Sequence, residues 1–365
     1  MDGQVARPDD PELKELLSRF VCVRCIQAWG IDLTRFRFDN GQSWCAFVLN
    51  AADGTVYGRY GTRSAPDASL YNSLEGFKKA LKASLELHAK YPGSRSLLDG
   101  KKSRDSRWRF PEIIPENQGR FEKLKDSRKG CLCCHLVQSG ELLSYRSLGA
   151  PVDDSDLWVF PMPDLLGLSL DPAETATVRA VAAGSEAESA GFRAGDKILS
   201  ADGEPVISIA DIQYALHVSK EPSKLAFKVD RGGAAADLSL SLPKHWRQRG
   251  EFSWRRATWP LRHRALGFAA EALPESDGAA LGLSAGTPAL RVTDVTQPNV
   301  QGGNQDARLA GLQKGDVIVE VDGRKAPSNE SRLIAYVFQN KPPGTKLQLT
   351  LLDGRGRKRI SFAVR

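Results

Sequence analysis

Residues 131–135 read CLCCH, which brings three of the chain's six cysteines beside one of its five histidines. Cysteine sulfur and imidazole nitrogen bind haem iron or zinc, and two cysteines can also exchange a disulfide. The spacing Cys131-x-x-Cys134-His135 therefore points to three kinds of chemistry: a covalent haem anchor, a metal site or a thiol pair.

The segment before this motif, FEKLKDSRKG at residues 121–130, predicts a short amphipathic helix. A helix that ends in Cys-x-x-Cys-His resembles the haem-attachment segment of c-type cytochromes. The resemblance implies a covalent haem c, with thioethers from Cys131 and Cys134 and with His135 as an iron ligand. Met162 is the candidate for the second axial ligand, and its rivals are His88, His245 and His263.

Other chemistries stay open for the same segment. Cys131, Cys133, Cys134 and His135 offer the ligand types of a zinc site, although adjacent ligands rarely complete one tetrahedron. The additional Cys133 also leaves thiol exchange open, and the cluster can be purely structural. Without haem we expect no other cofactor.

The region ahead of this motif predicts a domain of its own, residues 1–92. It reads as a helix at 11–19, a strand in FVCVRCIQ, a hairpin in WCAFVLNAADGTVYGRYG and a helix at 70–90. This order resembles the thioredoxin fold from its first helix onward. The resemblance implies an α/β domain around a central sheet.

Cys22 and Cys25 have the Cys-x-x-Cys spacing of a redox pair, which normally works at a helix N-terminus. Here the pair falls on a predicted strand, where residues three apart point to opposite faces. We therefore expect Cys22, Cys25 and Cys45 to be small buried side chains and the domain to be catalytically silent, with a redox pair as the alternative.

An internal repeat organises the second half of the chain. AGFRAGDKILSADG at 190–203 and AGLQKGDVIVEVDG at 310–323 align without a gap at an offset of 120. Ser208 and Ser328 keep this offset, and each is a predicted helix N-cap. Each copy then predicts a hairpin with period-two alternation. The order of elements predicts two small, partly open β-barrels with two helices each.

The pattern Ala-Gly-apolar-x-x-Gly-Asp-x-Ile with a later Asp-Gly resembles the PDZ domains of bacterial envelope proteins. The stretches LLGLSL at 165–170 and LGFAA at 266–270 match the Leu-Gly-apolar loop of such domains. The resemblance implies that a partner's extended C-terminus adds a strand at the sheet edge and that loop amides bind its carboxylate. The predicted peptide-binding residues are Leu166, Gly167, Leu168, Ile212 and Leu216 in the first copy, and Leu266, Gly267 and Phe268 in the second.

The whole chain therefore predicts a multidomain α+β protein: a thioredoxin-like α/β domain followed by two PDZ domains. The expected divisions are 1–92 for the thioredoxin-like domain, 93–155 for a charged connector with the CxxCH segment, 156–243 for the first PDZ domain, 244–260 for a basic and aromatic linker, and 261–365 for the second PDZ domain. This order resembles a group of bacterial envelope thioredoxin-like/PDZ proteins.

Charge and hydropathy argue against nucleic-acid-binding and transmembrane proteins. The net charge of +7 is spread along the chain among acids, so we expect no nucleic-acid partner. No apolar run is long enough for a transmembrane segment. We expect a periplasmic or secreted protein whose export signal is not present in this sequence, because its start shows no hydrophobic signal core.

The predicted function is a non-proteolytic envelope adaptor that binds protein C-termini or extended peptides and carries a haem c or redox site. The sequence contains no Gly-x-Ser-Gly stretch of the kind that holds the nucleophile of a serine protease, so we predict no catalytic residue. The alternative is a thiol-disulfide oxidoreductase or redox sensor whose PDZ domains select protein substrates.

Overall fold

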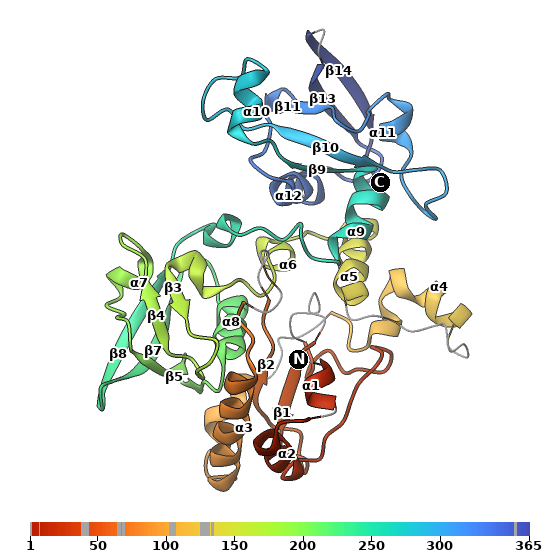
Figure 1. Ribbon diagram of the computed structural model, residues 1–365. Coiled ribbons are helices and arrows are strands. Elements are labelled where there is room, and N and C mark those ends of the chain that lie inside the picture. Colours follow the sequence, from red (N-terminus) through yellow and green to blue (C-terminus); the bar gives the residue numbers. More distant parts are fainter. Residues whose placement is uncertain are drawn as a thin grey trace. The chain divides into compact units, whose positions relative to one another are not determined.

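The computed structural model describes residues 2–6, 8–37, 44–63, 67, 70–101, 107–124, 132, 135–353 and 356–365. The chain divides into two compact units, shown in Figure 1. Unit 1 contains residues 1–134 and 158–250, and unit 2 contains residues 135–157 and 251–365. None of the helices in the described ranges is long and apolar enough to cross a membrane.

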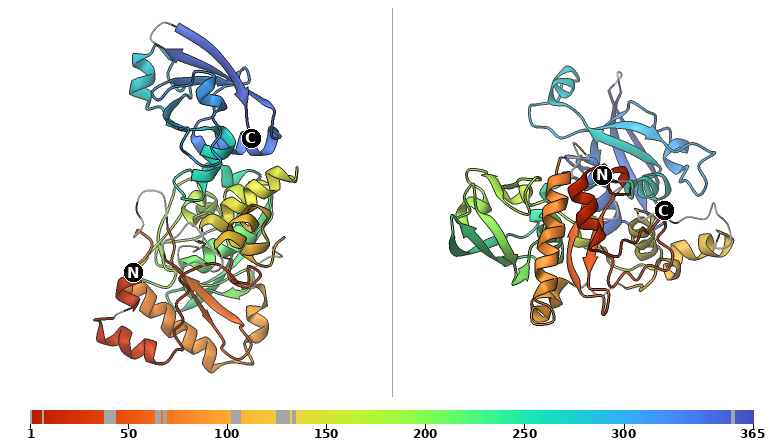
Figure 2. Two further views of the ribbon diagram at one scale, coloured as in Figure 1. Left: turned by 90° about the vertical axis from the view of Figure 1, so that its right-hand side faces the viewer. Right: turned by 60° about the horizontal axis from the view of Figure 1, so that its bottom comes forward.

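Unit 1 begins with helices and a small hairpin. The helices are α1 (Asp2–Ala6), α2 (Pro11–Ser18) and α3 (Leu74–Ala89), and the antiparallel strands are β1 (Ala46–Leu49) and β2 (Val56–Tyr60). Asp10 caps α2 by accepting a hydrogen bond from the Leu13 amide at 2.8 Å, and Ser73 caps α3 in the same way. The apolar faces of α2 and α3 pack with β2 into one core, and Figure 2 shows α3 beside the hairpin.

The predicted strand in FVCVRCIQ is wrong, because residues 21–28 form no regular element. Among the described strands, β1 and β2 pair only with each other, so no described strand pairs with this segment. Val21, Val23 and Ile26 are 86%, 81% and 78% exposed. Cys22, Cys25 and Cys45 are also exposed, so their predicted burial is wrong as well. The central sheet of a thioredoxin-like domain is therefore not confirmed.

The connecting region is helical in part. It contains the 3-10 helices η1 (Arg95–Lys101) and η2 (Pro111–Ile113) and the helices α4 (Pro115–Leu124), α5 (His135–Ser147) and α6 (Asp154–Leu157). Part of the predicted helix at 121–130 lies outside the described residues. The helices α5 and α6 belong to unit 2, so the expected connector at 93–155 is divided between the units.

The first repeat completes unit 1. Its elements are η3 (Pro163–Leu166), β3 (Leu168–Leu170), β4 (Val178–Val181), α7 (Glu186–Ser189), β5 (Lys197–Ala201), β6 (Glu204–Pro205), α8 (Ile209–Val218), β7 (Ser223–Arg231), β8 (Ala234–Leu242) and η4 (Trp246–Arg249). The sheets have the orders β3–β4 and β6–β5–β7–β8, with all pairs antiparallel. Figure 1 shows β7 and β8 as a long ribbon.

The second repeat follows the same order in unit 2. It contains α9 (Thr258–Pro260), the π-helix η5 (Leu261–Leu266), β9 (Phe268–Ala272), α10 (Glu275–Ala280), β10 (Leu290–Val295), α11 (Asp306–Leu309), β11 (Val317–Val321), β12 (Arg324–Lys325), α12 (Glu330–Asn340), β13 (Lys346–Asp353) and β14 (Gly356–Ala363). The sheet path is β14–β13–β11–β10–β9. The helix α10 is the insert that distinguishes this copy.

Two local predictions in the repeats have different outcomes. Asp202-Gly203 and Asp322-Gly323 are tight hairpin turns with positive φ at all four residues, as the Asp-Gly pairs predict. Ser208 is the N-cap of α8, as predicted, but Asn329 rather than Ser328 is the N-cap of α12. The two helices therefore correspond at an offset of 121.

Candidate functional site

The Leu-Gly-Leu loop of the first repeat joins η3 to β3. Gly167 has φ +84°, a left-handed conformation that disfavours any side chain. A Cβ atom at this position would also lie 2.2 Å from Cβ of Ser185. The loop therefore requires glycine for both its backbone conformation and its packing.

The structure brings the five predicted residues of the first repeat together. Leu166 and Leu168 are fully buried in one hydrophobic cluster with Ile212 and Leu216, which lie one turn apart on α8. Side chains four residues apart share a face of a helix, which explains why both reach this cluster. The loop, β3 and α8 thus form the arrangement that the resemblance predicts.

The strand β3 has an edge that no described strand covers, since its only sheet partner is β4. Toward β4, the Gly167 carbonyl accepts from the Ala182 amide and the Asp171 amide donates to the Thr177 carbonyl, both at 2.9 Å. Alternate residues of a strand direct their backbone groups to opposite edges. The amides of Leu168 and Leu170 therefore face the uncovered edge, where an added strand would pair.

The loop has its own electrostatics. The Gly167 amide donates to the Asp164 carbonyl at 2.9 Å, so this amide is already used. The Tyr71 hydroxyl donates to the Asp164 carboxylate at 3.2 Å. Burial raises the pKa of Asp164, and burial together with this carboxylate raises the pKa of Tyr71 to about 12.

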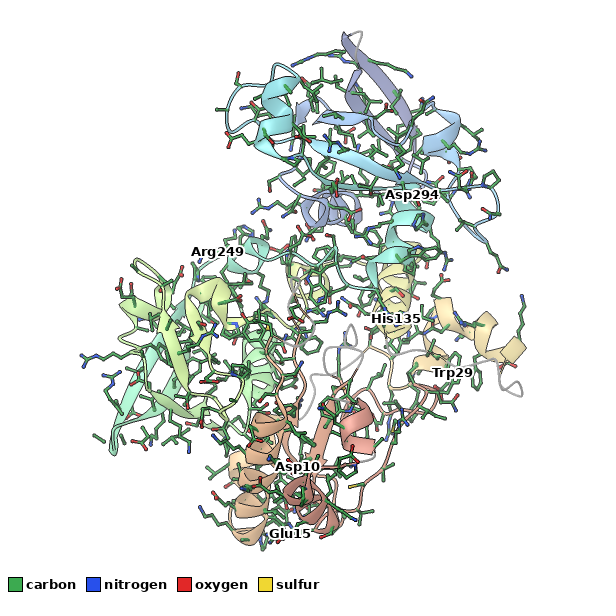
Figure 3. The ribbon with its side chains drawn as sticks, in the orientation of Figure 1. Asp10, Glu15, Trp29, His135, Arg249 and Asp294 are labelled. Atoms are coloured by element: carbon green, nitrogen blue, oxygen red, sulfur yellow. The ribbon has the colours of Figure 1, made fainter. Side chains whose placement is uncertain are left out.

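The start of the predicted basic and aromatic linker forms η4, which packs against this region. Trp246 is 0% exposed and belongs to the same hydrophobic cluster as Leu166 and Leu216. Arg247 donates to the Leu216 and Ser219 carbonyls at 2.8 and 2.7 Å. Arg249, labelled in Figure 3, donates to the Leu165 carbonyl at 3.4 Å and pairs with Glu186 at 2.7 Å. The short helix η4 thus bridges the loop and the end of α8.

The second repeat keeps the loop but closes the edge. Leu266 and Phe268 are fully buried, and Gly267 has φ +90°, with Asn304 O only 2.8 Å from an added Cβ. Glu330 at the start of α12 accepts from the Ala270 amide at 2.9 Å. Ala270 corresponds to Leu170 of the first repeat, so this hydrogen bond uses the amide that an added strand would need.

An ion pair holds Glu330 in this position. Arg262 donates to Glu330 through Nε at 2.8 Å and also through Nη2. The corresponding residues of the first repeat are Met162 at the loop and Ile209 at the start of α8. Both are apolar and buried, so the first repeat has no equivalent of this closure.

A buried charge cluster supports the opposite side of α8. Asp211 accepts from the amides of Arg59 and Ile207 at 3.2 and 3.0 Å, and its carboxylate pairs with Lys101 at 3.1 Å. The Arg59 guanidinium lies 3.6 Å from the Tyr214 ring centre. Burial lowers the pKa values of Lys101 and Arg59. These contacts fix α8 to β2 and η1, and sequence reasoning missed all three charged residues.

The structure describes only some of the predicted haem and redox residues. Cys131, Cys133 and Cys134 lie outside the described residues, and His135 is the first residue of α5 in unit 2. Met162 belongs to unit 1, where its side chain packs in the core of the first repeat.

Comparison with known proteins identifies one domain. The PDZ domain family matches residues 177–231, so the first repeat contains a PDZ domain, as predicted. The probable periplasmic serine endoprotease DegP-like of Pseudomonas savastanoi pv. phaseolicola (strain 1448A / Race 6) is 30% identical over 186 residues. This similarity covers 50% of the present chain and 36% of the relative, so the chain spans about a third of that protein.

Solved structures give a weaker likeness. An HtrA-type protease AlgW with a decapeptide has a TM-score of 0.23 and 21% identity, covering 38% of this chain and 41% of that one. The same protease with a tripeptide has a TM-score of 0.26 and 17% identity, covering 52% and 59%. These scores do not establish a shared overall fold.

The similarity to a serine endoprotease corrects the predicted function. The chain was expected to be a non-proteolytic adaptor with a haem c or redox site, or a thiol-disulfide oxidoreductase, and the relative is neither. The predicted functions of a non-proteolytic adaptor and of a redox protein are therefore wrong. The thioredoxin-like fold is not confirmed, and the covalent haem c stays an untested prediction. Peptide binding by the PDZ domain is the part of the prediction that the comparisons support.

Proposed function

We propose that this chain is a peptide-recognition component of HtrA-type proteolysis in the periplasm and that its first repeat binds the peptide. An extended segment adds to the uncovered edge of β3 and receives hydrogen bonds from the Leu168 and Leu170 amides. An apolar side chain of this segment packs toward Ile212 and Leu216. Leu166 and Gly167 form the loop at the end of the added strand.

The contrast between the two repeats carries this proposal. Both repeats have the same order of elements and a glycine of positive φ at the loop. The edge of β9 is closed by Glu330 and Arg262, whereas the corresponding residues Ile209 and Met162 cannot close the edge of β3. The second repeat, which we propose to be a PDZ domain as well, is therefore a scaffold and not the peptide receptor.

The proteolytic context rests on the relative. A periplasmic serine endoprotease shares 30% identity with half of this chain. We infer that a PDZ domain in such a system selects substrates by its affinity for exposed chain ends. In strand addition, backbone hydrogen bonds provide the affinity and pockets for alternate side chains provide the specificity. We propose that the present chain has this selecting role.

The binding test exchanges the residue pair that closes the β9 edge, Arg262 and Glu330, with the corresponding pair of the first repeat. Fluorescence polarisation with a library of labelled decapeptides that vary at the C-terminus should identify ligands of the intact chain. The double variant Met162→Arg/Ile209→Glu copies the closing pair into the first repeat and should weaken the best ligand at least about tenfold, the equivalent of one lost charged or backbone hydrogen bond. A second measurement, circular dichroism, reports whether this variant is folded.

The matched control is the reverse exchange, Arg262→Met/Glu330→Ile. It opens the edge of β9 and leaves the first repeat unchanged, so affinity for the best ligand should remain within about twofold. If this control loses the ligand and the first variant keeps it, the second repeat is the receptor and the proposal is wrong.

The proteolytic part has a separate readout. A stable periplasmic reporter that ends in the best ligand sequence should be degraded faster when the chain is co-expressed. The Met162→Arg/Ile209→Glu variant should remove this acceleration. Unchanged degradation, together with intact peptide binding, would contradict the link to proteolysis and leave the recognition site in place.

A further inference from the structure

The short helix η4 reaches both walls of the proposed peptide site. On one side, Arg247 donates to the Leu216 carbonyl in the last turn of α8. On the other side, Arg249 donates to the Leu165 carbonyl, which lies in the loop before β3. All of these residues belong to unit 1. The helix η4 therefore spans from the loop to α8, the two elements that a peptide added to β3 should contact.

The first residue of η4 places a large ring in the core of this repeat. Trp246 is 0% exposed and packs in the same hydrophobic cluster as Leu166, Ile212 and Leu216. We assign Ile212 and Leu216 to the contact with a ligand side chain. The Trp246 ring thus takes up apolar space in the cluster that this ligand side chain should reach.

The indole N–H of Trp246 is buried and has no hydrogen-bond partner within the described part of the chain. The neighbouring indole of Trp158 is buried too, but it donates to the Gly250 carbonyl at 2.9 Å. A buried donor without an acceptor destabilises its own position, because water would accept its hydrogen bond. The buried position of Trp246 is therefore less favourable than its apolar contacts alone indicate, as expected for a side chain that a ligand can displace.

Two further features weaken the attachment of η4. His245, the residue before it, has φ +61°, a left-handed conformation that costs free energy in a residue other than glycine. The Arg249 side chain, which pairs with Glu186, is 45% exposed, so water can replace this contact at little cost. Each of these features lowers the free energy needed to detach the four residues of η4.

We propose that η4 is an intramolecular occupant of the peptide site and that Trp246 fills the apolar space that a ligand side chain takes when a peptide adds to β3. This inference rests on the proposed peptide binding by the first repeat and concerns its regulation. The peptide and η4 then exclude each other. The apparent affinity of the chain is therefore the affinity of the open site reduced by the fraction of molecules in which η4 is detached.

Hydrogen exchange of the unmodified full chain tests this displacement directly. The amides of Trp246, Gln248 and Gly250 donate to backbone carbonyls of residues 243–247, so they exchange slowly while η4 keeps its structure. Saturation with the tightest-binding decapeptide of the library should slow exchange at 168–170 and accelerate exchange at 246–250 at least about fivefold. Protection at 168–170 with unchanged or slower exchange at 246–250 would overturn the proposal and leave peptide recognition by the first repeat intact.

A pair of variants separates a displaced side chain from an ordinary core residue. Trp246→Ala opens the site and should tighten binding of the same decapeptide at least about tenfold, measured by fluorescence polarisation. Phe227→Ala is the matched control, because it removes a buried ring of the same cluster from β7, and it should not tighten binding. Circular dichroism reports whether both variants are folded. If Trp246→Ala does not fold, the exchange measurement on the unmodified chain decides.

Free indole reverses the opening. Added in excess, it should enter the space left in Trp246→Ala and return the decapeptide affinity to within about threefold of the parent chain, with no effect on the parent or on Phe227→Ala. Unchanged or weaker decapeptide binding by folded Trp246→Ala would overturn the proposal. If neither the parent nor Trp246→Ala binds any decapeptide, the proposed peptide recognition is wrong, and this inference is wrong with it.

Discussion

Glu330 accepts a hydrogen bond from the backbone amide of Ala270 at 2.9 Å and at the same time pairs with Arg262. One carboxylate thus links the start of α12, the edge of β9 and the π-helix η5 within the second repeat. Glu330→Ala should lower the free energy of unfolding by about 3 kcal/mol, because it leaves a largely buried guanidinium without its partner. Urea unfolding measures this change. Arg262→Met/Glu330→Ile should recover most of it, and a larger loss in the double variant would contradict the ion-pair explanation.

The charge cluster behind α8 gives a stronger prediction. Asp211→Asn removes the carboxylate that faces Lys101 and Arg59, both of which are buried. Uncompensated buried charges cost about 3–5 kcal/mol, so chemical denaturation should show a loss of this size in unit 1. Asp237→Asn on the exposed side of β8 is the control and should stay within about 0.5 kcal/mol of the parent.

The loop glycine can be tested against a matched glycine. Gly167 and Gly203 have the same φ of +84°, but only Gly167 has an atom within 3 Å of an added Cβ, whereas Gly203 has none within 4 Å. Gly203→Ala should cost about 1 kcal/mol for backbone conformation alone. Gly167→Ala should cost clearly more, and Ser185→Gly in the same chain should restore part of the difference. Equal melting temperatures for the two alanine variants would show that Ser185 does not restrict the loop.

The stability of unit 2 should depend on pH through His263. Burial lowers the pKa of His263 below its ordinary value of 6.5. The Asp294 carboxylate, 3.9 Å away, opposes this shift, and the positive charge of Arg262 adds to it. The unfolded chain then binds a proton at a higher pH than the folded chain does. The contribution of the neutral ring is present above pH 6.5 and is lost as the pH falls through the lower folded pKa. His263→Asn should flatten the unfolding free energy between about pH 5 and 7, and an unchanged slope would assign it to other groups.

The bridge formed by η4 predicts a gain of affinity. Arg249→Ala removes the contacts to Leu165 and Glu186 that attach η4 to the loop and α7. Because η4 covers the residues that a bound side chain should reach, its release should increase peptide affinity about two- to tenfold, measured by polarisation. Weaker binding in this variant would mean that Arg249 contacts the ligand.

The sequence alone was sufficient to predict the structural features that depend on short stretches of residues. The repeat, the Asp-Gly turns and the glycine at 167 follow from residues next to one another in the chain, and the structure has them where predicted. The apolar stretch at 20–27 was misread because alternation predicts a strand only when a partner strand is available, and β1 pairs with β2 alone among the described strands.

The differences between the repeats could not be predicted in the same way. Closure of the β9 edge depends on Arg262, Ala270 and Glu330, which are separated by up to 68 positions. Lys101 and Asp211 look like surface residues in the sequence, since charged side chains are rarely buried without a partner. Only the fold brings such partners together.

The three-residue length of β3 also bears on self-association. A long uncovered strand invites the same edge of another copy and leads to aggregation. Three residues offer so few backbone hydrogen bonds that a chance encounter between two copies is short-lived. A ligand whose side chains also pack on α8 gains enough additional contact to stay. The short strand therefore favours binding of segments that also contact α8 and disfavours edge-to-edge pairing between two copies of the chain.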